Sequence, residues 1–140
     1  MIRKFKETDI NCIMKLWLET NIYAHNFIDE KYWQSNYEQV RQMMPEALIY
    51  VYEEDSIKGF IGLSGNYIAG LFVEANSQSK GIGKALLDYI KGINKELFLH
   101  VYKKNERAVR FYIREGFSVE GELTDINTNE TELAMKWESK

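Results

Sequence analysis

The chain has 140 residues and a hydrophobic content of 45%, which is enough to bury the core of one ordinary domain, so we expect a single domain over residues 1–140. Its net charge of -3 argues against a nucleic-acid partner, because proteins that bind phosphate backbones need a concentrated excess of lysine and arginine. The single cysteine, Cys12, excludes an internal disulfide and a thiolate metal cluster, and no metal is expected.

Nothing in the sequence indicates a secretory or membrane segment. Residues 1–7 include charges where a signal peptide needs an uninterrupted apolar stretch, and no later run approaches membrane-spanning length. We therefore expect a cytoplasmic protein that makes no membrane contact.

The first third of the chain is predicted to form one strand and two helices. Residues 2–6 alternate apolar and polar as a short strand does, and Thr8 offers a side-chain oxygen that can cap the following helix. After a break at residues 23–26, Asp29 can cap a second helix that ends at Pro45. In the first helix, apolar residues recur every three or four positions, as on a helix laid against a core: Ile10, Ile13, Met14, Trp17 and Leu18.

Strands dominate the middle of the chain. Residues 47–53 and 57–64 are rich in β-branched and aromatic residues and predict an antiparallel hairpin, which a third strand follows at 67–73. A helix with apolar residues at 82, 86, 87 and 90 then leads to a strand at 97–102. A strand, helix, strand unit of this length makes a right-handed crossover, so the strands at 67–73 and 97–102 should be parallel neighbours.

The last part of the chain is predicted to close the sheet. Residues 105–115 form a short helix that Gly116 ends in a left-handed conformation, and residues 117–123 and 131–137 form a hairpin. The fold class is therefore α/β, with a mixed, mostly antiparallel central sheet and helices on both faces.

A glycine-bearing loop, Gln78 to Gly83, joins a predicted strand to a predicted helix. Unpaired backbone N–H groups and the positive end of the helix face one point there, which makes an anion site. A dinucleotide fingerprint needs a small residue where Leu86 stands, and a P-loop needs Ser or Thr where Ala85 stands. A glycine turn that only starts a helix stays open as an alternative at this point.

The loop resembles the Q/R-x-x-G-x-G/A motif of the GNAT superfamily of acyl-CoA-dependent N-acetyltransferases. Residues 105–117 are similar to the N-x-x-A-x-x-F/Y-Y-x-x-x-G-F segment that the same family carries after its next strand. Both blocks occur in the family's order. The resemblance implies a GNAT-like fold in which a splayed pair of parallel strands binds acetyl-CoA as co-substrate.

The resemblance also implies which residues bind the cofactor. The pantetheine arm would pair with the backbone of residues 71–73, and the pyrophosphate would lie on the N–H groups of residues 79–84. Basic residues in the two motif segments would add a positive field: Lys80, Lys84, Lys103, Lys104 and Arg107. The cofactor-binding positions implied in this way are Leu71, Phe72, Val73, Gln78, Ser79, Lys80, Gly81, Ile82, Gly83, Lys84, Asn105, Ala108, Phe111 and Tyr112.

Acetyl transfer to an amine needs a proton acceptor, a donor to the carbonyl oxyanion and a proton for the departing thiolate. The resemblance implies Tyr112 as the general acid and the backbone N–H of Phe72 or Val73 as the oxyanion donor. His100 stands where some branches of the family carry a base glutamate, and a histidine can accept a proton near neutral pH. Ala69 occupies a site where other branches carry an acidic residue, so water remains the alternative base.

The acceptor is expected to enter over the first two helices and to be a primary amine of a small molecule or peptide. A homodimer is compatible with such a fold. The main alternative function is a catalytically inactive coenzyme A-binding sensor or interaction module; a Rossmann-type domain conflicts with Leu86 and with the antiparallel hairpins. Candidates for the acceptor's lining, many of which such spacing also predicts as core, are Tyr23, His25, Asn26, Trp33, Tyr37 and Tyr67.

Overall fold

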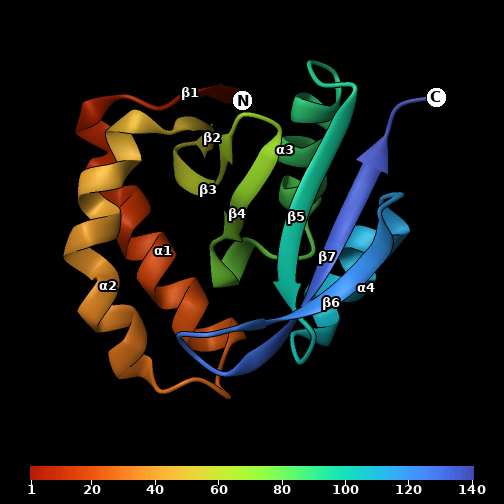
Figure 1. Ribbon diagram of the computed structural model, residues 1–140. Helices are drawn as coiled ribbons and strands as arrows, with labels where there is room; N and C mark the ends of the chain where they lie inside the picture. Colours follow the sequence, from red (N-terminus) through yellow and green to blue (C-terminus); the bar gives the residue numbers. More distant parts are fainter.

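A seven-stranded sheet runs through the molecule, as the computed structural model of residues 1–140 shows (Figure 1). Across the sheet the order is β1-β2-β3-β4-β5-β7-β6, and only β4 and β5 pair in parallel, which confirms the predicted mixed sheet and its parallel neighbours. The last strand in sequence thus lies between β5 and β6. The strands are β1 (Ile2–Lys4), β2 (Leu48–Glu54), β3 (Ser56–Ser64), β4 (Tyr67–Val73), β5 (Glu96–Tyr102), β6 (Ser118–Asp125) and β7 (Glu130–Glu138).

Four helices cover the two faces of this sheet, as the sequence predicted. Helices α1 (Ile10–Ala24) and α2 (Glu30–Met43) pack together on one face, and α3 (Ile82–Lys91) and α4 (Glu106–Arg114) lie on the other (Figure 1). Single 3₁₀ turns stand at Glu7–Asp9, Met44–Glu46 and Ala75–Ser77. None of the helices combines the length and the apolar character that crossing a membrane requires.

Each face of the sheet has its own hydrophobic core. Leu97 and Leu99 of β5 point toward α3 and pack in the same cluster as its Leu86 and Leu87. Tyr102 points to the opposite face and belongs to the cluster built on α1 and α2. Because side chains alternate along a strand, His100 lies on the same face as Tyr102.

Strand β4 carries the irregularity that opens the sheet. Leu63 of β3 pairs with Ile68, whereas the preceding Gly62 pairs with Gly70, so Ala69 is an extra residue that forms a β-bulge. On its other edge, β4 pairs with β5 at only two positions, Tyr67 with Phe98 and Ile68 with Leu99. Beyond the bulge the two parallel strands separate, and the backbone groups of β4 that face β5 have no partner strand.

The start of α1 differs from the prediction. Thr8 lies inside a 3₁₀ turn and caps nothing; α1 begins at Ile10, with Asp9 at the position before it. The Asp9 carboxylate accepts the backbone N–H of Lys6 at 2.8 Å and two nitrogens of Arg3 at 2.8 and 3.0 Å. The turn is therefore fixed by a carboxylate that also fastens it to β1, which a threonine hydroxyl could not do.

Candidate active site

A cleft of about 930 Å³ opens where β4 and β5 separate. Its walls are the end of β4, the loop into α3, helix α4 and the last turn of α1. All the predicted cofactor positions line it except Lys80, and of the predicted acceptor positions Tyr23, His25 and Asn26 line it. Four residues that the sequence predicted for the acceptor side or for catalysis do not line it: Trp33, Tyr37, Tyr67 and His100.

The glycine loop presents free amides to this cleft. The first hydrogen bond of α3 runs from the N–H of Ala85 to the carbonyl of Gly81 at 2.9 Å, so the amides of residues 82–84 have no partner within the helix. Gly81 has a φ of +82°, which a glycine adopts without strain. A Cβ at Gly83 would lie 3.6 Å from the ring of Phe111 and 3.7 Å from Val73, both of which line the cleft. The loop therefore forms an open cradle for an anion.

Arg107 ties this loop to α4. Its guanidinium donates to the Oε1 of Gln78 and, at 3.1 Å, to the hydroxyl of Ser79. Gln78 in turn donates to the carbonyl of Val73 at 3.1 Å, so three segments around the cleft are connected. Arg110 and Arg114 also line the cleft and were missed at the sequence level. The signal was present, because spacings of three and four residues bring these arginines to one side of the helix.

The predicted cluster of basic residues is only partly available to a phosphate. Lys84 pairs with Asp88 and Glu115, Lys103 with Glu122, and Lys104 with Glu130. These lysine side chains are 58–62% exposed, so the pairs are weak and can exchange. The positive charge that lines the cleft itself comes from Lys84 and the three arginines of α4.

Asn105 connects α4 to the end of α1. Its Oδ1 accepts the backbone N–H of Ala108 at 3.3 Å, which caps α4. Its amide nitrogen lies 3.2 Å from Nε2 of His25 and must be the donor, because Oδ1 is already used. His25 therefore accepts at Nε2 and carries its hydrogen on Nδ1. Burial lowers the pKa of His25 to about 4, although the backbone of Asn21 opposes the shift, so the ring is neutral at physiological pH.

Aromatic rings surround His25 on the side away from Asn105. The imidazole stacks on Trp33 with centroids 5.4 Å apart and meets Phe27 and Tyr102 edge-on at 5.7 and 5.0 Å. Trp33 is 8% exposed and packs against Trp17, so it is mainly a core residue. Tyr37 is partly buried and also packs on Trp17. Phe27 belongs to the aromatic loop at residues 24–27 but is not among the predicted lining residues.

Tyr112 is held inside the cleft wall. Its side chain is 8% exposed and its ring packs edge-on against Phe111 and Phe117 at 5.2 and 5.5 Å. No protein group hydrogen-bonds its hydroxyl, and burial raises its pKa, so the phenol stays protonated. His100, by contrast, is exposed on the opposite face of β5, where its ring meets Tyr67 edge-on at 5.4 Å.

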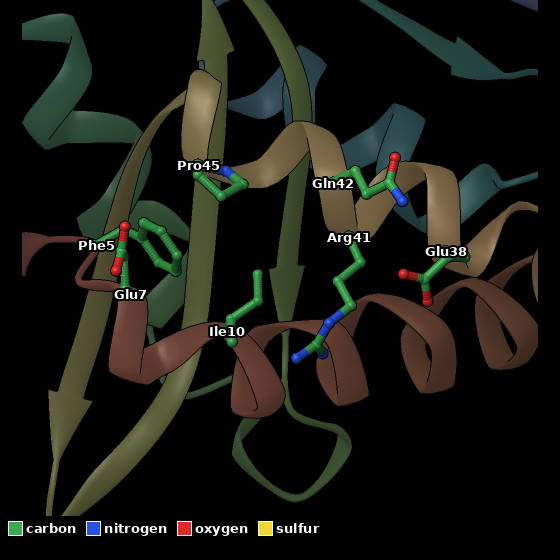
Figure 2. Close-up of a pocket in the computed structure, with 7 residues that line it drawn as sticks. All are labelled: Phe5, Glu7, Ile10, Glu38, Arg41, Gln42 and Pro45. Atoms are coloured by element: carbon green, nitrogen blue, oxygen red, sulfur yellow. The ribbon is translucent and has the colours of Figure 1, made fainter.

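A second hollow of about 360 Å³ lies at the other end of α1 and α2 (Figure 2). It shares no lining residue with the cleft and contains none of the predicted cofactor or acceptor residues, and its only candidate bases are the carboxylates Glu7 and Glu38. No group of His, Cys, Asp and Glu side chains gathers where it could hold a metal ion. The cleft at the β4–β5 separation is therefore the candidate active site. The hollow is lined by Phe5, Glu7, Ile10, Glu38, Arg41, Gln42 and Pro45.

Comparison with known proteins gives the same family as the two motif segments. Residues 19–138 match the family described as Acetyltransferase (GNAT) domain. The chain is 36% identical over 122 residues to the peptidyl-lysine N-acetyltransferase YiaC of Escherichia coli (strain K12), covering 85% of this chain and 84% of YiaC. It is 30% identical over 122 residues to the peptidyl-lysine N-acetyltransferase YjaB of the same strain, covering 86% of this chain and 83% of YjaB.

Solved structures agree with this match. The solution structure of apo-form YjaB from Escherichia coli has a TM-score of 0.86 at 28% identity and covers 98% of this chain and 96% of its own. The PaiA N-acetyltransferase from Thermoplasma acidophilum in complex with coenzyme A has a TM-score of 0.82 at 23% identity, covering 99% and 98%, and shows the shared fold. With the family match extending over most of the sequence, the chain belongs to the GNAT superfamily and is an acetyl-CoA-dependent N-acetyltransferase.

Proposed function

We propose that this enzyme transfers the acetyl group of acetyl-CoA to the ε-amino group of a lysine in a peptide or protein, with Tyr112 as general acid. The identity to YiaC and YjaB, both named peptidyl-lysine N-acetyltransferases, supports the choice of acceptor. One observation favours an enzyme over a sensor. Tyr112 lines the same cleft as the free amides of α3, and no protein group forms a hydrogen bond with its hydroxyl.

The residues of the cleft fit acetyl-CoA. The free amides of residues 82–84 and the guanidinium of Arg107 suit the pyrophosphate, since both donate hydrogen bonds toward an anion. The unpaired edge of β4 at residues 71–73 suits the amide groups of the pantetheine arm, which can bond to it as an added strand. Gly83 leaves open the space between Val73 and Phe111 that a larger side chain would fill.

Each chemical step then has a candidate group on this chain. When the amine nitrogen forms its bond to the thioester carbon, a backbone N–H of β4, at Phe72 or Val73, stabilises the negative charge on the carbonyl oxygen. As the carbon–sulfur bond breaks, Tyr112 donates its phenolic proton to the sulfur. The raised pKa of Tyr112 keeps that proton in place until then, and the apolar wall that raises it also makes a buried thiolate more basic.

The proton lost by the amine has to leave on the other side. His100 remains our candidate acceptor for it, because it lies on the face of β5 opposite α3, just past the last residue that pairs with β4. Its exposure means that water can also take this proton directly. Both routes leave Tyr112 as the acid.

The proposal is tested by thiol release from acetyl-CoA with a lysine-containing peptide, spermine and an amino acid as acceptors, for the wild type and Tyr112→Phe. We expect turnover with the peptide, a fall in kcat of about a hundredfold or more in Tyr112→Phe, and unchanged coenzyme A affinity. Undiminished turnover in Tyr112→Phe would remove the acid assignment. Tight coenzyme A binding without turnover on any amine would favour the sensor, and preference for spermine would replace the lysine assignment.

A further inference from the structure

The face of β5 and β7 opposite α3 carries a surface that the donor cleft does not use. Leu133 and Met135 of β7 pack in the α3 core, so Glu132 and Ala134 point to the other face. Glu132 stands directly across from Tyr102 of β5. Because Leu99 is the last residue of β5 that pairs with β4, Tyr102 borders the gap between the two strands. Glu132 is therefore one strand away from the opening at which the acetyl group is transferred.

Glu132 is a partly buried carboxylate that no protein group engages. The neighbouring acids of β7 have partners, since Glu130 pairs with Lys104 at 3.1 Å and Glu138 pairs with Lys136. Asp125, the other acid on this side, accepts the hydroxyl of Tyr102 at 2.6 Å and the backbone N–H of Asn127 at 2.9 Å. Burial and the charge of Asp125 raise the pKa of Glu132, and His100 acts in the opposite direction. A partly exposed carboxylate without a hydrogen-bond or ion-pair partner is available to pair with a cationic ligand.

The surroundings of Glu132 are aromatic. Tyr102 meets His25 at 5.0 Å and Phe27 at 5.8 Å, and Tyr67 lies edge-on against His100 at 5.4 Å. Burial raises the pKa of Tyr67 and of Tyr32, and the charge of Glu132 adds a smaller part to both shifts. A carboxylate among aromatic rings attracts an ammonium group through its charge and through cation–π contact.

Two polar atoms at the end of α1 and in α2 also lack partners. Nδ1 of His25 and Nε1 of Trp33 are buried and make no hydrogen bond, and the Trp33 side chain is more than nine-tenths buried. On the far side, Lys104 pairs with Glu130 and lies over the ring of Phe27, and Figure 1 shows the turn between β6 and β7 next to the loop that links α1 and α2. The His25 and Trp33 nitrogens both carry hydrogens, so they can donate to an oxygen of a ligand, such as a peptide carbonyl, and not to its ammonium group.

We propose that Glu132 is the counter-charge that receives the ammonium group of the acceptor at the mouth of the cleft and so selects cationic amines. Glu132 is a specificity residue in this role, and Tyr67 and Tyr102 form the aromatic sides of the site. The proposal rests on the proposed function, because it names the feature by which that reaction chooses its acceptor.

The test compares the wild type with Glu132→Gln, which keeps the shape of the side chain and removes its charge. Glu122→Gln is the matched control, since Glu122 is an exposed glutamate on the neighbouring β6 that is already paired with Lys103. The probes are a capped Gly-Lys-Gly peptide and the same peptide with norleucine in place of lysine. Binding of each peptide to the coenzyme A complex is measured by calorimetry, and KM and kcat are measured for the lysine peptide.

For Glu132→Gln we expect the affinity and the KM for the lysine peptide to weaken about tenfold or more, with kcat nearly unchanged. The preference for lysine over norleucine should collapse, whereas coenzyme A affinity and acceptor-independent hydrolysis of acetyl-CoA should match the wild type. Glu122→Gln should keep the lysine preference. Glu132→Asp should keep most of it, which guards against a loss caused by misfolding.

The outcomes separate the two proposals. If the wild type acetylates the peptide and Glu132→Gln binds it equally well, the Glu132 assignment is wrong and the proposed function stands. If the wild type acetylates only spermine and Glu132→Gln loses spermine affinity, the lysine assignment fails and Glu132 keeps its role. A wild type that binds coenzyme A but neither binds nor acetylates any of these cations overturns both.

Discussion

Replacement by alanine should lower the stability of the protein at Gly81 and raise it at Gly83, the two glycines at the start of α3. In Gly81→Ala the new Cβ meets nothing within 4 Å, so the only cost is that of an L-residue at a φ of +82°, about 1–2 kcal/mol. In Gly83→Ala the nearest atom is 3.6 Å away, which is ordinary contact, and alanine in a helix gains about 0.5–1 kcal/mol over glycine.

These energies translate into measurable shifts in melting temperature. For 140 residues the entropy of unfolding is about 0.3 kcal/mol per kelvin, so Gly81→Ala should lower Tm by about 3–7 °C and Gly83→Ala should raise it by about 2–3 °C. Calorimetric unfolding checks both values. Coenzyme A affinity should fall about tenfold in Gly81→Ala, because the loop loses its conformation, and should be nearly kept in Gly83→Ala, where the family motif admits alanine.

A control separates strain from binding. Gly65 in the turn between β3 and β4 has a φ of +61° and also has free space around its Cβ position, but it does not line the cleft. Gly65→Ala should therefore lose stability as Gly81→Ala does and bind coenzyme A as the wild type does. Changes in Tm of the same sign in Gly81→Ala and Gly83→Ala would refute this account of the loop. Normal coenzyme A binding in Gly81→Ala would refute it as well.

Two further perturbations test the electrostatics of the site. Burial lowers the pKa of His25 to about 4 in the folded protein, whereas the pKa of an unfolded histidine is about 6.5. The unfolded chain therefore takes up the proton first, and stability falls as the pH drops from 6.5 to 4. The loss is on the order of 2–3 kcal/mol, and urea unfolding of His25→Gln should show a flatter pH dependence over that interval; an identical slope would contradict the assignment of a neutral, buried imidazole. Arg107→Ala should weaken acetyl-CoA binding about tenfold and reduce its salt dependence, because one cation beside the loop is removed. Arg41→Ala, far from the cleft, is the control, and calorimetry at two salt concentrations measures the binding of acetyl-CoA. Equal affinity of the two variants for acetyl-CoA would contradict the role of Arg107.

Local patterns in the sequence predicted the framework of the fold. Helical and strand periodicity located the elements, Gly116 has the expected left-handed conformation with a φ of +96°, and the crossover rule correctly paired β4 with β5. The misses depend on contacts between distant residues. Thr8 does not cap α1 because the chain forms a 3₁₀ turn there, which the Asp9 carboxylate fixes through Arg3 of β1 and the N–H of Lys6. The bulge at Ala69 reflects pairing with β3 rather than any property of alanine.

The candidate site also has a part that the sequence predicted, the donor side, and a part that it largely did not, the acceptor side. The donor side follows one strand end, one loop and one helix, so its residues stand in two short motifs and gather in one cleft. The acceptor side joins residues far apart in the sequence, and aromatic spacing could not separate the buried Trp33 from Phe27 or indicate Glu132 at all. That the chain forms a single domain, acts in the cytoplasm and pairs as a homodimer stay predictions.

The bulge at Ala69 bears on how such enzymes diverge. The separation of β4 from β5 begins at the one additional residue in the register between β3 and β4, and a bulge bends the strand that carries it. We therefore expect substitutions that keep this extra residue to leave the opening in place, and deletion of Ala69 to extend the pairing of β4 with β5. Descendants of one ancestor can in this way keep the donor they inherited while the loops on the other face adapt to new acceptors.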